Sequence, residues 1–107
     1  MFQLLSEKGG TIFMHRSITT QDFDVVFRQL KPAILDLRED AALLPNALQI
    51  PATELPSRLG ELDKDTTYFV LSYSGRKAAV ITEFLAEQGY DAVLVIGGAY
   101  SWQRYAA

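Results

Sequence analysis

The sequence predicts a single α/β domain built around a parallel β-sheet. Segments with helical and with strand-like periodicity alternate from about residue 17 onward, which is typical of a parallel sheet covered by helices. The candidate strands are nearly continuous apolar runs, as a sheet that is covered on both faces requires. With 107 residues and a hydrophobic content of 49%, the chain is too short for two full domains but long enough to bury a core without metal or disulfide bonds.

The first 15 residues differ in character from the rest of the chain. Apolar residues at 2–5 and 11–14 flank a polar stretch at 7–10, and this pattern predicts a β-hairpin. We therefore divide the chain into an N-terminal extension, residues 1–15, and a main domain, residues 16–107. A hairpin this short must pack on its own domain or on a second copy, so we expect either an intramolecular strap or a homodimer through the extension.

The first helix and strand of the main domain follow directly. Thr19 or Thr20 can cap a helix that runs to Leu30. Hydrophobic residues at three- and four-residue spacing give this helix one apolar face: Phe23, Val26, Phe27 and Leu30. Pro32 stops the helix, and residues 33–37 are predicted to form a short buried strand.

The middle of the chain is less regular. Residues 38–49 show no clear period and are predicted to be a connection. A short helical turn is expected from Thr53 to Leu59, with Thr53 as its cap and Gly60 as its stop. After a polar turn, the apolar run at 67–71 predicts a second strand.

The last third of the chain returns to a regular pattern. Residues 77–88 are predicted to form a helix, because hydrophobic residues line one face and Gly89 follows as a stop. Residues 92–96 form the third clear strand. The two glycines that follow it predict a turn into a last short helix at 99–105.

Composition and charge exclude several classes of function. The formal net charge is −3 and the charges are mixed along the chain, so we expect no binding to nucleic acid. We find no basic leader and no apolar run of membrane-spanning length, so we expect a cytoplasmic protein that does not bind membranes. The chain contains no cysteine, which rules out a thiol nucleophile, thiolate metal sites and iron–sulfur clusters within it. A G-x-G-x-x-G motif is absent, and Glu39 and Asp40 have no histidine near them in the sequence, so we expect neither a cofactor nor a metal.

The segment whose residues most clearly suggest a binding or catalytic role is the loop after the strand at 67–71. A loop that leads from a parallel strand into a helix presents free backbone N–H groups and the positive end of the helix dipole, which together favour an anion. A glycine permits a tight curl there, and two adjacent cations add positive charge. The candidate anion-binding residues are Ser72, Tyr73, Ser74, Gly75, Arg76 and Lys77. The alternative is that the two serines only cap the helix and that the two cations form a solvated surface.

Five segments of the sequence occur in the order, and near the spacing, of a known family: residues 34–39, 47–51, 68–78, 89–93 and 97–102. Together they span about residues 17–105, and over this length the chain resembles a single-domain rhodanese. The resemblance implies a three-layer α/β/α fold with a central, mainly parallel five-stranded sheet. It also implies an active-site loop between the fourth strand and the next helix and, for the family, thiosulfate sulfurtransferase activity.

The resemblance also assigns individual residues. Asp36 and Arg38 match an Asp-x-Arg pair that supports the site in the family, and Gly75 matches the loop glycine. Ser72 stands where the family has its catalytic cysteine, and Lys77 stands where it commonly has arginine. The connection after Arg38 is also shorter than in the family, which shortens one wall of the pocket. From its place at the end of a strand, Asp36 is expected to accept backbone N–H bonds rather than to act as a catalytic acid.

These observations lead to one main hypothesis and two alternatives. An oxygen atom cannot carry transferable sulfur as a persulfide, and a nucleophilic Ser72 would need an adjacent base, whereas the sole histidine, His15, lies in the N-terminal extension. We therefore expect a catalytically inactive rhodanese-like domain that acts as a regulatory module and binds a small oxyanion or a partner protein. The first alternative is a sulfurtransferase-family enzyme in which Ser72 is a natural or engineered replacement of cysteine. The second is an enzyme that acts on a phosphate or sulfur ester through the Ser72 loop.

Overall fold

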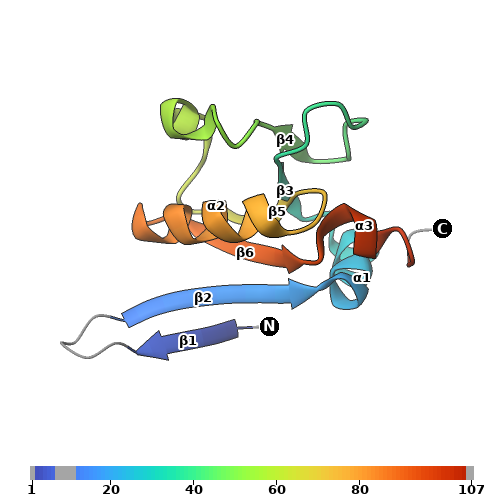
Figure 1. Ribbon diagram of the computed structural model, residues 1–107, viewed down its shortest axis with the longest axis horizontal. Helices are drawn as coiled ribbons and strands as arrows, with labels where there is room; N and C mark the ends of the chain where they lie inside the picture. The colour runs from blue at the N-terminus through green and yellow to red at the C-terminus, as the bar shows by residue number, and fades with distance from the viewer. Residues whose placement is uncertain (1, 7–11, 106–107) are drawn as a thin grey trace.

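The computed structural model describes the backbone of residues 2–6 and 12–105 and the side chains of residues 16–105. Within this part of the chain, five parallel strands and one antiparallel edge strand form a single sheet in the order β1-β2-β6-β5-β3-β4 (Figure 1). The strands are β1 (Phe2–Ser6), β2 (Ile12–Thr19), β3 (Ala33–Asp36), β4 (Ala47–Gln49), β5 (Thr67–Leu71) and β6 (Asp91–Ile96). This topology confirms the predicted α/β fold with a mainly parallel sheet.

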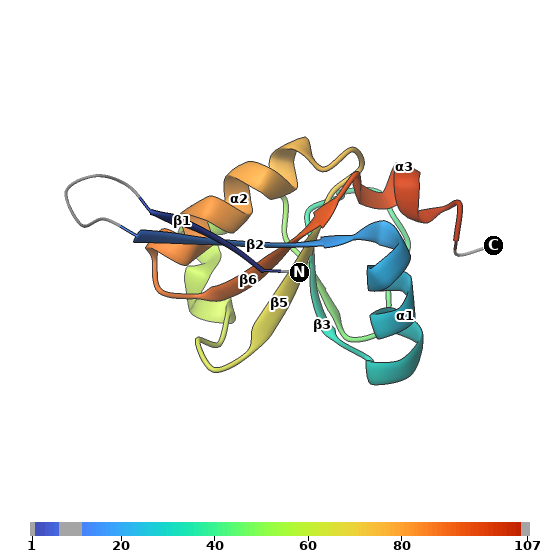
Figure 2. The same cartoon turned by 90° about the horizontal axis from the view of Figure 1, so that it is seen from below.

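Helices cover both faces of the sheet, as a three-layer fold requires (Figure 1, Figure 2). They are α1 (Thr20–Leu30), the 3₁₀ helix η1 (Leu55–Glu61), α2 (Arg76–Glu87) and α3 (Gly98–Trp102). Residues of α1 and α3 pack on one face of the sheet, while residues of η1 and α2 pack on the other. Within the described residues, no helix is both long enough and apolar enough to cross a lipid bilayer.

The two faces of the sheet bury separate hydrophobic clusters, because successive residues of a strand point to opposite sides. Ile34 and Leu71 belong to the cluster under α1 and α3, whereas Leu35 and Val70 belong to the cluster under α2. All four side chains are fully buried. The loops that leave the carboxyl ends of β3 and β5 therefore start from residues that are fixed in the core.

The regular elements begin and end close to where the sequence predicts. For α1, the Thr19 side chain accepts a hydrogen bond from the Asp22 N–H at 3.1 Å, which satisfies one of the free amides of the first turn. Lys31 ends the helix in the left-handed conformation, with φ of 47°, and Pro32 follows. The predicted bounds of β3, β5, α2 and β6 are correct to within one residue at each end.

The apolar stretches of the N-terminal segment form two neighbouring strands. β1 and β2 pair in antiparallel register, and the turn between them, residues 7–11, lies outside the described residues. β2 crosses the boundary placed after residue 15, and its last three residues pair in parallel with β6. The extension is thus continuous with the central sheet (Figure 2). The homodimer through residues 1–15 stays a prediction.

Two predictions for the irregular middle of the chain are wrong. The segment 38–49 is more than a connection, because its end forms β4, a strand of three residues that is too short to show a period. The helical turn is a 3₁₀ helix that begins at Leu55, where Pro56 favours a first turn. Thr53 does not cap this helix, and Gly60, the predicted stop, lies inside it.

Candidate functional site

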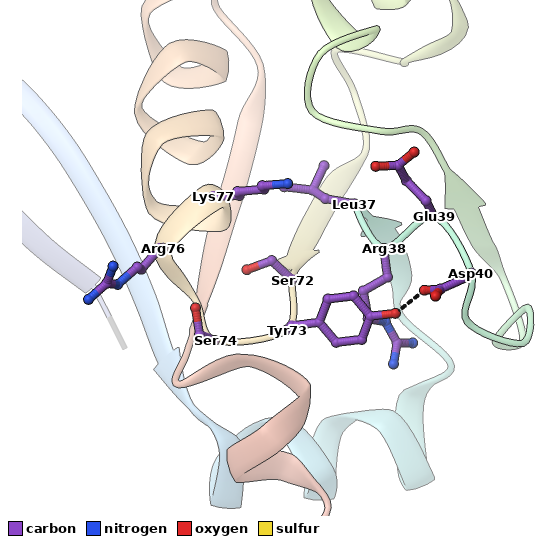
Figure 3. Close-up of a pocket in the computed structure, with 9 residues that line it drawn as sticks. All are labelled: Leu37, Arg38, Glu39, Asp40, Ser72, Tyr73, Ser74, Arg76 and Lys77. Carbon is purple, nitrogen blue, oxygen red and sulfur yellow. Dashed lines mark hydrogen bonds between the residues drawn. The ribbon is translucent and has the colours of Figure 1, made fainter.

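The loop between β5 and α2 lies at the carboxyl edge of the sheet, where the resemblance places an active-site loop. It forms one side of a pocket of about 590 Å³, and the residues that follow β3 form the opposite side (Figure 3). The pocket is lined by Leu37, Arg38, Glu39, Asp40, Ser72, Tyr73, Ser74, Arg76 and Lys77. Six of the eight residues predicted for the site therefore line this pocket, and the other two, Asp36 and Gly75, hold lining residues in place.

Ser72 is the residue around which the loop folds. Its side chain is buried, with 4% of the residue exposed, and its Oγ accepts hydrogen bonds from the N–H groups of Gly75 at 3.0 Å and Ala78 at 3.3 Å. A hydroxyl oxygen has two lone pairs, and these two amides occupy both. Ser72 therefore closes the loop and satisfies an amide of the first turn of α2, whereas Ser74 lies at the exposed surface.

The turn between β6 and α3 supports the same loop through backbone hydrogen bonds. The carbonyl oxygens of Ser72 and Tyr73 accept hydrogen bonds from the N–H groups of Ala99 at 2.8 Å and Tyr100 at 3.0 Å. This approach is possible because Gly98, with φ of 64°, carries no side chain where it meets those carbonyls. The sequence predicted only a turn at this position, and α3 begins one residue earlier and ends three residues sooner than expected.

Asp36 and Arg38 form a buried, bidentate ion pair beside the pocket. Arg38 donates from Nε to Oδ1 at 2.9 Å and from Nη2 to Oδ2 at 2.8 Å, and its backbone N–H donates to Oδ1 at 3.0 Å. Asp36 is fully buried, and its hydrogen bond to the guanidinium raises the pKa of Arg38. The expectation that Asp36 accepts a backbone amide is confirmed. Its carboxylate also balances the charge of Arg38, which leaves little net charge for a ligand.

Tyr73 joins the loop to the opposite wall of the pocket. Its hydroxyl donates a hydrogen bond to the Asp40 carboxylate, and this bond raises the pKa of Tyr73 (Figure 3). The ring stacks on Tyr100, with centroids 5.5 Å apart, and the Arg38 guanidinium lies 5.9 Å from the Tyr73 centroid. Tyr73 therefore stays protonated at neutral pH and bridges the two walls. Sequence reasoning placed Tyr73 in the loop but missed Asp40 as its partner.

Charged side chains of both signs line the pocket. Arg76 and Lys77 begin α2, are exposed, and form no ion pair within the described part of the chain. Figure 3 shows Lys77 extending across the pocket toward Leu37, while Arg76 points to the other side of the helix. Glu39 and Asp40 stand on the opposite wall.

The sole histidine of the sequence is remote from this loop along the sheet. His15 lies on β2, where its backbone pairs with Gln3 of the edge strand. From there β2 continues to Thr19 before it reaches the carboxyl edge, a distance of roughly 13 Å along a strand. Among the described residues, no group of three metal-ligating side chains could hold a metal ion.

The parallel sheet, the helices on both of its faces and the loop at its carboxyl edge define an α/β domain of the three-layer class. The family model of the rhodanese-like domain matches residues 19–105, which is most of the sequence. The chain belongs to this family.

Individual relatives agree with that assignment. A sulfurtransferase of Allochromatium vinosum is 32% identical over 77 residues, which cover 67% of this chain and 72% of that protein. The crystal structure of a rhodanese-related protein from Thermoplasma volcanium matches with a TM-score of 0.76 and 30% identity, covering 86% of this chain and 94% of that one. A rhodanese-like domain protein from Staphylococcus aureus matches with a TM-score of 0.73 and 34% identity, covering 81% and 90%.

Proposed function

We propose that this chain is a non-catalytic rhodanese-like domain that binds a small oxyanion in the pocket beside Ser72 and acts as a binding or regulatory module. The observation that carries the proposal is the hydrogen bonding and burial of the Ser72 hydroxyl. Both of its lone pairs accept backbone N–H groups, and the residue is 4% exposed. Both hydrogen bonds draw on the oxygen that a nucleophilic mechanism would use, and they weaken it as a nucleophile.

The chemistry of sulfur transfer supports the same conclusion. A sulfurtransferase of this type needs a thiolate that accepts the transferred sulfur as a persulfide, and this chain contains no cysteine. A serine nucleophile needs an adjacent base to take its proton. In the described residues, the hydrogen bonds of Ser72 Oγ go to backbone amides and not to a basic side chain. This argues equally against an ester-cleaving enzyme that uses Ser72.

The chain should show no thiosulfate:cyanide sulfurtransferase activity above the rate without enzyme, and Ser72→Ala should leave that background unchanged. Turnover that disappears in Ser72→Ala would contradict the proposal. Ser72→Cys should restore little activity, because Lys77 and the short 39–46 segment change the charge and shape of the pocket together. Strong activity in that variant would instead favour a sulfurtransferase whose cysteine was replaced.

An oxyanion fits the part of the pocket next to α2. Gly75 and Ala78 donate to Ser72, so the amides of Arg76 and Lys77 are the groups of the first turn that stay without a partner inside the helix. The positive end of the α2 dipole and the Lys77 ammonium attract negative charge to the same place. These groups persist whatever side chain occupies position 72.

Sulfate should raise the melting temperature more than chloride does at equal ionic strength. Millimolar affinity at tens of millimolar sulfate corresponds to about 1–2 kcal/mol of added stability. Arg76→Ala combined with Lys77→Ala should remove the sulfate-specific part of this effect. Lys64→Ala combined with Arg104→Ala removes the same charge at a distance from the pocket and should not. An unchanged effect in the first variant would mean general salting or a different site.

A further inference from the structure

The pocket beside Ser72 is not a purely cationic site. Its α2 wall contributes Arg76 and Lys77, and its opposite wall contributes Glu39 and Asp40. Arg38 also lines the pocket, but the buried Asp36 balances its charge through two hydrogen bonds. Because the Arg76 side chain points to the other side of the helix, the charges available to a ligand are the Lys77 ammonium on one side and two carboxylates on the other (Figure 3).

The two walls do not neutralise each other directly. No ion pair joins Arg76 or Lys77 to Glu39 or Asp40 within the described residues. Asp40 accepts one hydrogen bond from a tyrosine hydroxyl, and a carboxylate has further lone pairs with which it can accept others. Both walls thus keep hydrogen-bonding capacity for a molecule that lies between them.

This arrangement discriminates between kinds of oxyanion. A plain sulfate or phosphate is attracted by the α2 wall and repelled by the carboxylates across the pocket. A molecule that also carries an ammonium group turns that repulsion into attraction. The volume of about 590 Å³ lies within the range of small-molecule sites and leaves room for both groups.

We propose that the ligand of this pocket is a small zwitterion, whose oxyanion group lies against the start of α2 with Lys77 and whose ammonium group lies against Glu39 and Asp40. The inference rests on the proposed function, because it uses the same oxyanion site. It adds the carboxylate wall as the element that selects among oxyanions.

The test compares O-phosphoethanolamine with ethyl phosphate, which has the same phosphate ester but lacks the ammonium group. Calorimetric titration at low ionic strength should give about fivefold tighter binding of phosphoethanolamine to the unmodified chain, as expected for an exposed charge interaction. Glu39→Gln combined with Asp40→Asn should make the two affinities similar, because the variant should bind phosphoethanolamine more weakly and ethyl phosphate more tightly. Lys77→Gln should weaken the binding of both probes.

A matched variant separates this local effect from the net charge of the molecule. Glu83→Gln combined with Glu87→Gln removes two carboxylates from α2 outside the pocket and should preserve the preference. Equal binding of the two probes to the unmodified chain would overturn the zwitterion proposal and leave the oxyanion site standing. A preference that survives Glu39→Gln with Asp40→Asn would also overturn it. Absence of binding by both probes would overturn the proposed function itself.

Discussion

Replacing Asp36 with alanine is expected to lower the free energy of unfolding by about 3–5 kcal/mol. The carboxylate is fully buried and makes both hydrogen bonds of a bidentate pair with Arg38, whose side chain is 12% exposed. Removing it leaves a guanidinium with little water and without its hydrogen-bonded counter-charge, so that only the Coulombic influence of Asp40 remains. Urea denaturation followed by the fluorescence of Trp102, the single tryptophan of the sequence, measures the loss.

An exposed ion pair provides the control for this experiment. Glu61 accepts two hydrogen bonds from Arg58, at 2.7 and 3.0 Å, but both side chains are solvent-accessible. Glu61→Ala should therefore leave the unfolding curve nearly unchanged, because exposed pairs contribute little. If Asp36→Ala were as mild as Glu61→Ala, the buried pair would not be a support of the site.

Gly98→Ala is expected to destabilise the domain by about 2–4 kcal/mol, through a steric clash and a strained backbone together. The added Cβ would press on the carbonyl oxygen of Ser72 and lie 2.6 Å from that of Tyr73, and both are backbone atoms that cannot rotate away. The φ of 64° adds strain for any residue other than glycine. Because the clash falls on the loop, the sulfate-induced rise in melting temperature should also be lost.

Gly60→Ala is the matched control, since a Cβ at that position meets no atom within 4 Å. Its melting temperature and its response to sulfate should stay close to those of the unmodified chain. A Gly98→Ala protein with normal stability and a normal sulfate response would show that the β6–α3 turn does not support the loop.

The sequence predicts those elements that are long enough to show a period or a stop signal. α1 has a cap at Thr19, and α2 is followed by Gly89, whose φ of 88° is the conformation that ends the helix. β4 cannot be predicted in this way, because a strand of three residues is too short to show a period. The bounds of η1 are misplaced, because an irregular 3₁₀ helix shows no regular period either. The sheet with its five parallel strands came from the resemblance, since periodicity alone indicated three clear strands.

The site divides along the same line. The strand–loop–helix joint at Ser72 can be predicted from local sequence, because its partners lie within a few residues. The pairing of Asp36 with Arg38 came from the resemblance to the family, although the two residues are also close in sequence. The hydrogen bond from Tyr73 to Asp40 joins residues that are 33 positions apart in the sequence. The contact of Gly98 with Ser72 joins the loop after β6 to the loop after β5. No local pattern encodes such contacts, because they depend on how the strands are ordered.

Thiosulfate offers the most direct measurement of non-catalytic binding at the Ser72 loop, since it is both an oxyanion and the sulfur donor of the family reaction. Titration of the ¹⁵N-labelled chain, with sulfite measured in the same samples, follows binding and chemistry together. We expect reversible shifts at the amides of Ser74, Arg76 and Lys77 and no release of sulfite. Sulfite that accumulates with time and is abolished by Ser72→Ala, or a loop whose amides do not respond to thiosulfate, would contradict the proposed function.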